Sequence, residues 1–528
     1  MVLIVAMIAM VLTMALLPPL SQLAHRTGLL AYPAARKVHE GAIPQIGGIA
    51  FSLCALVGAS WLMPPSHAYI GYLVGAAAAF ALGLYDDYRE LGYGSKFVVQ
   101  FAGAALAIAI AGISTIDLGE PFGALASWLA VPVALAFLVG TTNAVNHADG
   151  LDGLAGGLTL VSCLALSICA LQGENDFALI VPLVIAGGVI GFLRFNTHPA
   201  QIFMGNGGAY FLGFSLGFAA LVLSNAPTGP NFVTAVMLLG VPVIDTAFIP
   251  IYRYAHGRNL FASDRSHLHH RLLEAGFSHR SSVALIYAVH GALVLTGWSL
   301  RNGSGIVRIC AFATLAFAIE SAPVLLAPLR RALRMQLVAL RPSAWLGRGL
   351  CLAAFVAMLT STVVAVASAP SVTIDFFVCA LLALAMVFAW ERVRGDRGLS
   401  WPARCGLYVL GAYTVYFQSQ ETETFGVSWN TAAFGVVALF LVFRLVTGRS
   451  RAFALTTLDL LVVLSMIAVA VVGRDVFSAS TVDVVKLVVW FYGVELLADD
   501  QEHGNWLRGL TYCGFGVIAA RGAMELLV

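Results

Sequence analysis

The stretch GLYDDYRELGYGSKF, residues 83–97, places two adjacent aspartates at the end of a long apolar run, with a lysine nine residues after the second. Because an apolar run of about 20 residues spans a bilayer, Asp86 and Asp87 fall where a membrane helix ends. Such a pair is usually a solvated polar cap at the headgroup boundary. Charged residues at membrane depth cost about 2.5–3.5 kcal/mol each near a helix centre, which makes them functional candidates. The other polar loops of the chain favour the functional interpretation.

The composition is typical of a polytopic membrane protein. Of the 528 residues, 60% are hydrophobic and only 11% are charged, and the mean hydropathy is +0.89. Soluble globular domains lie outside this range. We therefore predict an all-α fold with about eleven membrane spans in residues 1–340 and about seven in residues 341–528. The first apolar run lacks a basic n-region and a cleavage site, which predicts a retained helix and not a signal peptide.

Charge and cysteine content exclude little beyond nucleic-acid binding. A net charge of +2 is too small to indicate a nucleic-acid partner. The eight cysteines are scattered without paired spacing, mostly inside apolar runs. They are expected to fill the core.

Lys and Arg residues are divided unevenly between the connecting loops. The loops around residues 64–67, 114–123, 172–176 and 224–231 contain none, and only Arg301 and Arg308 break this pattern. By the positive-inside rule the basic loops are cytoplasmic, so the N-terminus is predicted to lie outside. The basic loops hold Arg26, Arg36, Lys37, Arg89, Lys96, Arg194, Arg253, Arg258, Arg265, Arg271, Arg280, Arg330, Arg331 and Arg334. Every polar motif lies on this same side.

A second polar loop reads NAVNHADGLDGLAGG, residues 143–157. Its Asn143, Asn146, Asp149 and Asp152 recur every three residues. In a 3₁₀-like or irregular turn these side chains would line one side, whereas in an α-helix only neighbours in the series share a face. The glycines among them allow a phosphate or sugar to approach the backbone closely. A plain turn does not need four oxygen-bearing side chains at fixed spacing, so a binding site is favoured.

A third polar loop reads FNTHPAQIFMGNGGAYFLGF, residues 195–214, and a fourth reads DRSHLHHRLLEAGF, residues 264–277. Asp264, His267 and His270 fall at i, i+3 and i+6, so neighbours are expected to share one helical face, with His269 pointing elsewhere. Three close histidines would suit zinc. The other loops offer oxygen ligands, which suit Mg²⁺ better.

The positive charge near these histidines indicates a different role for them. Arg253, Arg258 and Arg265 belong to the same loop region. Guanidinium groups bind phosphate oxygens in pairs. The segment is therefore better suited to hold a diphosphate than a zinc ion.

Five motifs together resemble the polyprenyl-phosphate N-acetylhexosamine-1-phosphate transferases, of the glycosyltransferase family 4 type. They are most similar to the bacterial branch that primes O-antigen and related cell-surface glycans, and the resemblance covers about residues 1–340. The motifs are RKVHEGAIPQIGG (36–48), DDYRELGYGSKF (86–97), NAVNHADGLDGLAGG (143–157), IFMGNGGA (202–209) and DRSHLHH (264–270).

The resemblance implies a reaction and a location. An N-acetylhexosamine-1-phosphate would pass from a UDP-sugar to undecaprenyl phosphate, with release of UMP. Mg²⁺ would be required, with Mn²⁺ as the alternative ion, at the cytoplasmic face of a bacterial inner membrane. The residue chemistry agrees, because two polyanions that meet at a membrane surface need a cation and basic groups to offset their charge.

The resemblance also implies residue roles. Asp86 and Asp87 point about 100° apart on a helix, so one would orient or deprotonate the lipid phosphate while the other supports the metal. Asp149 and Asp152 would face the nucleotide-sugar. The implied metal ligands are Asn146, Asn206 and Asp87, and the further catalytic candidates are His267 and His270. The implied substrate-binding residues are Lys37, His39, Lys96, Asn143, Arg253, Asp264, Arg265 and His269.

Two positions depart from the family pattern. Asn206 stands where the pattern has an aspartate at the metal. An amide oxygen still binds Mg²⁺, but the lost negative charge is expected to lower affinity and rate. Ala31 stands where the family usually has an acidic residue, so no role is assigned to it.

Residues 341–528 lie outside the resemblance. They contain basic turns at residues 392–404 and 444–451 and a polar loop at 417–430 that lacks Lys and Arg. We find no catalytic constellation there. The predicted role is structural or partner-binding, as a homodimer interface or a docking site for the next glycan-assembly enzyme or a flippase.

A transporter and a scaffold are the alternatives to an enzyme. A transporter would place broken helices and ionisable residues near the bilayer midplane, whereas these motifs cluster at helix ends on one side. A catalytically weakened or silent scaffold of the same fold is favoured only by Asn206. GlcNAc, GalNAc and deoxy-amino sugars fit the sequence equally.

Overall fold

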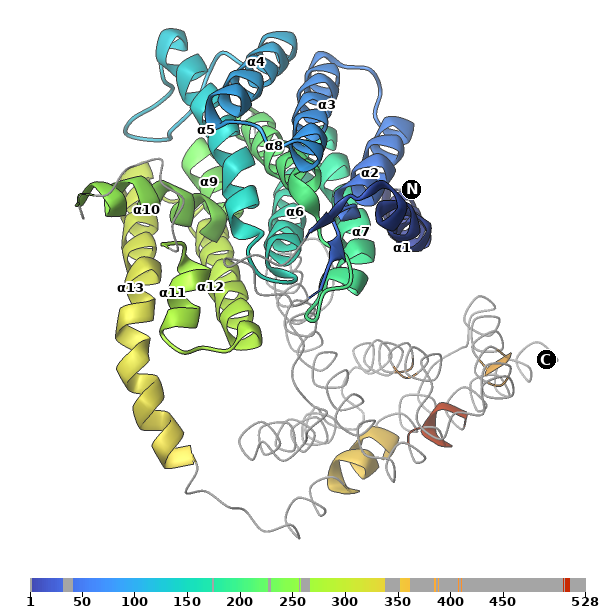
Figure 1. Ribbon diagram of the computed structural model, residues 1–528. Helices are drawn as coiled ribbons and strands as arrows, with labels where there is room; N and C mark the ends of the chain where they lie inside the picture. The colour runs from blue at the N-terminus through green and yellow to red at the C-terminus, as the bar shows by residue number, and fades with distance from the viewer. Residues whose placement is uncertain are drawn as a thin grey trace, which may run out of the picture. The chain divides into compact units, whose positions relative to one another are not determined.

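Apolar helices make up almost all of the described chain (Figure 1). The computed structural model describes residues 2–31, 41–172, 175–226, 229–255, 257, 266–337 and 352–360, with a few positions beyond (384, 385, 388, 407, 410, 507 and 509–512). The elements are α1 (Val2–Thr27), β1 (Leu30–Ala31), β2 (Ile43–Pro44), α2 (Gly47–Leu62), α3 (His67–Tyr88), α4 (Tyr93–Ala111), α5 (Ser127–Ala148), α6 (Leu154–Gln172), α7 (Asp176–Asn196), α8 (Gly205–Ser224), α9 (Phe232–Leu239), α10 (Val241–Ala255), α11 (Leu268–Glu274), α12 (His279–Ser299) and α13 (Gly305–Leu337).

The predicted all-α membrane fold is confirmed. In the described part of the chain, nine helices are long and apolar enough to cross a bilayer. One bent pair and the shorter apolar helix α2 add to these. The seven further spans predicted in residues 341–528 lie almost entirely outside the described residues, and so does the predicted domain boundary at residue 340.

Helix α8 forms the centre of the bundle, because nearly all of its side chains are buried. It packs against α3 and α5, and also against α2 and α7. A Cβ atom on Gly83 of α3 would lie 2.4 Å from the carbonyl oxygen of Asn206. Only glycine allows this approach. The close packing brings the Asp-Asp end of α3 to the start of α8.

The loop that precedes α2 joins the same region through backbone pairing. Strands β1 and β2 pair antiparallel, and Gln45 forms a parallel bridge to Phe203 just before α8. The amide of Gly47 donates to the carbonyl of Phe203 at 2.9 Å. The segment before α2 and the segment before α8 therefore meet.

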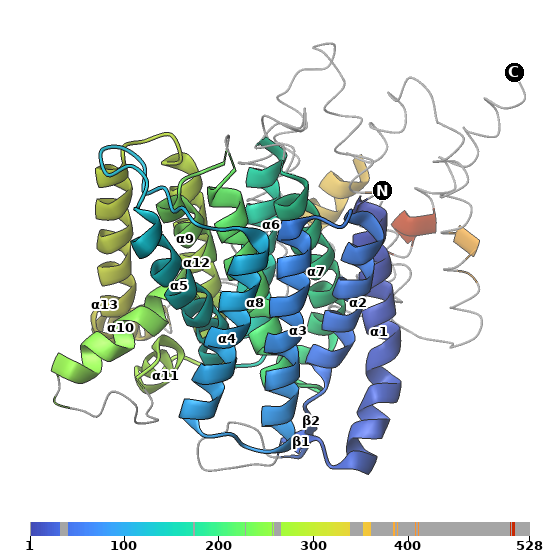
Figure 2. The same ribbon diagram turned by 90° about the horizontal axis from the view of Figure 1, so that it is seen from above.

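The polar loops gather at one end of the helices (Figure 2). Helices α1, α3, α5 and α7 finish at this end, and α2, α4, α6, α8 and α12 begin there. The two basic exceptions at the opposite end have protein partners. Arg308 is buried and donates from Nη1 to the Arg301 carbonyl at 2.7 Å, and the Arg301 guanidinium lies 4.0 Å from the centroid of the Trp298 ring.

One span is broken. Helices α9 and α10 meet at 95° around Gly240, whose φ is +63°. A break leaves backbone amides without helical partners. Here Nδ1 of the buried His290 accepts from the Val241 amide at 3.2 Å, and its Nε2 lies 3.2 Å from the Ser162 hydroxyl. The Val241 amide at the break is therefore satisfied within the protein.

Candidate functional site

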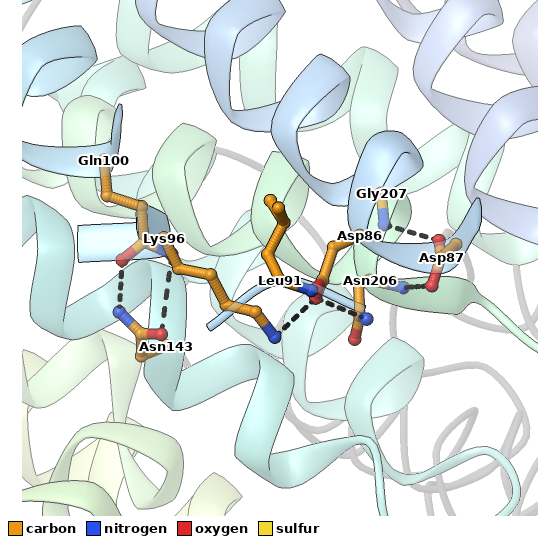
Figure 3. Close-up of polar contacts among 8 residues, drawn as sticks. All are labelled: Asp86, Asp87, Leu91, Lys96, Gln100, Asn143, Asn206 and Gly207. Atoms are coloured by element: carbon orange, nitrogen blue, oxygen red, sulfur yellow. Dashed lines mark hydrogen bonds and ion pairs between the residues drawn. The ribbon is translucent and has the colours of Figure 1, made fainter. Parts of the chain in front are cut away.

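Asp86 is buried among donors from the loop after α3 and from α4 and α8 (Figure 3). Its Oδ2 lies 2.7 Å from Nζ of Lys96 and accepts from Nδ2 of Asn206 at 2.9 Å. Its Oδ1 accepts from the amide of Leu91 at 2.9 Å. The side chain is only 1% exposed, so it is not a solvated cap.

Asp87 meets different partners, as the 100° separation on a helix predicts. Its two oxygens accept from the amides of Asn206 and Gly207, at 2.9 and 3.0 Å. These amides lie in the first turn of α8, where unpaired N–H groups and the helix dipole favour an anion. Gly205 just before them has φ of +75°, and a Cβ there would lie 2.7 Å from Asp87 Oδ2. The paired aspartates thus fix α4 and α8 onto the end of α3.

Two predicted substrate-binding residues have protein partners in this network. Lys96 is paired with Asp86, so its phosphate-binding role stays a prediction. A phosphate would bind Lys96 either together with Asp86 or in its place. The amide nitrogen of Asn143 donates to Gln100 Oε1 and to the carbonyl of Val139, both at 2.8 Å (Figure 3). Asn143 therefore faces α4 and is absent from the lining of the cavity described next.

A cavity of about 660 Å³ opens beside the paired aspartates. Residues from four parts of the sequence line it: the β2 region, the end of α5 with its loop, the loop before α8 with its first turn, and α11 with the start of α12. Five residues predicted from the sequence are brought together in its wall. They are Asn146, Asp149, Asp152, Asn206 and His270.

The carboxyl of Asp149 has an unusual environment. Burial raises the pKa of Asp149 to about 7, and the negative charges of Asp87 and Asp152 add to this effect. Three carboxylates that repel one another form a place where a divalent cation is stabilising.

The donor atoms in the cavity wall fit Mg²⁺. The Asn206 amide nitrogen is directed to Asp86, which leaves the amide oxygen for another partner. With Asn146 and Asp149 it gives a set of oxygen ligands, the kind that Mg²⁺ prefers. The predicted ligand Asp87 accepts two backbone hydrogen bonds instead, and its metal role stays a prediction.

The histidine loop differs from the expected single helical face. Helix α11 begins only at Leu268, so His267 precedes it as the N-cap residue. His267 Nδ1 lies 2.8 Å from Oδ2 of Asp245, whose Oδ1 accepts from the Leu268 amide at 2.9 Å. The expectation that His267 and His270 follow one another on a helix face is therefore wrong. Asp245 holds both the cap and the first turn.

The environment of His269 disfavours a positively charged imidazole. The ring is 3% exposed and lies directly against Gly150. Burial, with the neighbouring His270 imidazole, lowers the pKa of His269 to about 3. A neutral imidazole adds no positive charge to a diphosphate site, so the predicted substrate contact of His269 would be a hydrogen bond only.

The remaining candidates are divided between the described and the undescribed parts of the chain. Arg253 is half-buried in α10, and its substrate contact stays a prediction. Arg271 anchors α11 to α13, with Nη1 2.6 Å from Glu320 Oε2. Lys37, His39, Asp264 and Arg265 lie outside the described residues.

Sequence reasoning missed three residues of the site. Asp245 is an acidic residue within an apolar helix, which by itself is a functional signal. His198 lies inside the third polar loop, and His279 lies two residues beyond the end of the fourth. Among the described residues, the group that could hold a metal is Asp152, His198 and His279, and not the histidines of residues 267–270.

Comparison with known proteins gives consistent relatives. Residues 69–224 match the family described as "Glycosyl transferase family 4". The chain is 36% identical over 293 residues to the "Probable undecaprenyl-phosphate N-acetylglucosaminyl 1-phosphate transferase" of Bacillus subtilis, a match that covers 54% of this chain and 81% of that protein.

Two further relatives carry related names. The "Decaprenyl-phosphate N-acetylglucosaminephosphotransferase" of Mycobacterium tuberculosis is 33% identical over 319 residues, which cover 54% of this chain and 78% of that protein. The "Undecaprenyl-phosphate alpha-N-acetylglucosaminyl 1-phosphate transferase" of Yersinia pestis is 31% identical over 299 residues, which cover 54% and 80%. With this coverage and the site geometry, the chain belongs to the polyprenyl-phosphate N-acetylhexosamine-1-phosphate transferases of glycosyl transferase family 4.

Proposed function

We propose that this protein transfers an N-acetylhexosamine-1-phosphate from a UDP-sugar to undecaprenyl phosphate and releases UMP, as the priming step of O-antigen or related glycan synthesis. The observation that carries this proposal is the convergence of Asn146, Asp149, Asp152 and Asn206 on one cavity beside Asp86. The relatives named above act on undecaprenyl or decaprenyl phosphate.

The reaction has a simple atom balance. An oxygen of the lipid phosphate attacks the phosphorus that bears the sugar. The bond from this phosphorus to the bridging oxygen of the diphosphate breaks, and UMP leaves with that oxygen. The protein's task is to bring two polyanions together in line and to offset their charge.

Each part of the site has a role in this scheme. Lys96, held by Asp86, supplies positive charge next to the paired aspartates. The first turn of α8, fixed by Asp87, directs Asn206 toward the cavity. Asn146, Asp149 and Asn206 would hold Mg²⁺, with Mn²⁺ as the alternative, and the ion would neutralise charge on the phosphate oxygens.

Release of UMP tests the proposal. Purified protein, undecaprenyl phosphate and Mg²⁺ are incubated with UDP-GlcNAc, UDP-GalNAc and UDP-linked deoxy-amino sugars. We expect UMP and a lipid-linked sugar diphosphate with at least one donor, and no product after chelation of divalent ions. No UMP from any donor would favour the silent scaffold.

The broken span between α9 and α10 is the one feature shared with a transporter. The Val241 amide at the break, however, is paired with His290, which is itself paired with Ser162. Asp245, the acidic residue of this span, is paired with His267 and the Leu268 amide. This supports the enzyme over the transporter.

The orientation in the membrane is proposed from the basic loops. The site would face the cytoplasm of a bacterial cell, with the N-terminus outside. We expect that, in a cysteine-free background, Glu90→Cys near the site is protected from an impermeant thiol reagent added to intact cells. Pro65→Cys and Asn302→Cys at the opposite end should be labelled. The reverse labelling pattern would contradict the orientation and the cytoplasmic reaction.

A further inference from the structure

One histidine, with a second stacked on its ring, lies against one oxygen of Asp152 in the cavity wall. Nδ1 of His198 lies 2.7 Å from Asp152 Oδ2, and the amide of Ala200 donates to the same oxygen at 3.2 Å. The rings of His198 and His279 are stacked, with centroids 4.2 Å apart and planes at 24°. Nε2 of His279 lies 3.9 Å from the same Oδ2. The loop before α8 and the start of α12 thus meet on Asp152.

The direction of the His198 contact is fixed by its partner. A carboxylate only accepts hydrogen bonds, so Nδ1 of His198 carries the hydrogen. The donors meet Oδ2, and Oδ1 makes no hydrogen bond within the described residues. Asp152, His198 and His279 all line the cavity, and their side chains are 18%, 34% and 12% exposed. The histidine therefore fixes the carboxylate with one oxygen available to a ligand.

A hydrogen-bonded pair explains this group better than a metal site. Two ligand atoms around one tetrahedral ion, each about 2.0–2.1 Å from it, lie about 3.3 Å apart. The 2.7 Å between His198 and Asp152 is instead the length of a charge-assisted hydrogen bond. The 3.9 Å between His279 Nε2 and the same oxygen is longer than the separation of two ligand atoms on one such ion.

The charge of Asp152 indicates which part of a substrate it meets. A carboxylate repels phosphate and attracts N–H and O–H donors. Resting on the proposed function, we propose that His198, supported by the His279 ring, is a positioning residue for donor binding: it fixes Asp152 so that Oδ1 accepts from an N–H or O–H of the nucleoside or sugar of the UDP-sugar.

The test separates the hydrogen bond from the ring. His198→Phe keeps a ring to stack on His279 and removes the donor, whereas His198→Gln keeps an N–H donor without the ring. We expect His198→Phe to raise the KM for the UDP-sugar about tenfold or more, the scale of one lost hydrogen bond to a charged group. The KM for undecaprenyl phosphate and the kcat should stay within about twofold. His198→Gln should recover most of the donor KM.

Controls distinguish this proposal from a folding defect. His67→Phe makes the same change at an exposed histidine that begins α3 at the opposite end, and should leave every constant unchanged. His279→Phe keeps the stack and should change the donor KM less than His279→Ala. Thermal unfolding of each variant shows whether the fold is retained. If His198→Phe does not fold, the donor KM of His198→Gln is compared with that of wild type instead.

Direct binding of UMP and UDP-sugar makes the outcome independent of turnover. Weaker binding of both ligands by His198→Phe places the Asp152 contact on the nucleoside, and weaker binding of the UDP-sugar alone places it on the sugar. Unchanged donor KM and binding in His198→Phe, or equal losses in Phe and Gln, would overturn the positioning role. If the wild-type protein binds one equivalent of Zn²⁺ or Mn²⁺ and His198→Phe does not, the group is a metal site and the positioning role is wrong. If the wild-type protein binds UMP and UDP-sugars but produces no UMP from any UDP-sugar, only the proposed reaction is contradicted. If it binds no nucleotide at all, both the proposed reaction and the positioning role are contradicted.

Discussion

Asp86→Asn and Asp87→Asn are each expected to reduce UMP release at least ~100-fold, the usual scale for a positioned acid-base or charge-stabilising group. Asp86 offsets the charge of Lys96 and accepts a hydrogen bond from the Asn206 side-chain amide, so the loss of its charge leaves Lys96 without an ionic partner there. Asp87 holds the amides of the second and third residues of α8. An asparagine oxygen accepts these bonds without the negative charge.

The control for both variants is Asp176→Asn. Asp176 is exposed in the first turn of α7, at the opposite end of the bundle. It should leave UMP release unchanged, and all three variants should reach the membrane in equal amounts. Near-normal turnover in both site variants would leave the pair with a purely structural role between α3, α4 and α8.

The sequence predicts the general placement of the site because its signals are local. Apolar run length predicts the helices, and the uneven distribution of Lys and Arg predicts that the polar loops share one end of the bundle. The spacing of Asn146, Asp149 and Asp152 predicts oxygen ligands close together, and all three do line one cavity. Alternation of helix direction alone brings such loops to one side.

The partners of each side chain depend on contacts that local patterns do not carry. Asn206 lies 120 positions from Asp86, and their contact requires α8 to approach α3 at Gly83. His267 was expected inside a helix, but Asp245 from α10 holds it as a cap. These contacts follow from helix packing, which no spacing within one loop specifies.

Asn206→Asp is expected to lower the Mg²⁺ concentration for half-maximal UMP release about tenfold or more and to raise turnover. The amide nitrogen of Asn206 donates to Asp86 Oδ2 at 2.9 Å. A carboxylate at 206 would place two negative oxygens together with Lys96 as the nearby cation. A divalent ion then relieves repulsion as well as gaining a charged ligand.

This repulsion gives Asn206→Asp a second readout that does not require turnover. Without divalent ions the variant should unfold at a lower temperature than wild type, and Mg²⁺ should stabilise the variant more, because a ligand that binds only the folded state stabilises it by mass action. Asn225→Asp, at the other end of α8, makes the same change far from the cavity and should leave Mg²⁺ dependence unchanged. If the added charge repels the incoming phosphates instead, turnover falls while Mg²⁺ affinity still rises. If the Mg²⁺ dependence of UMP release and of thermal unfolding is the same in wild type and Asn206→Asp, residue 206 is not a metal ligand. If neither protein releases UMP, the silent scaffold is favoured.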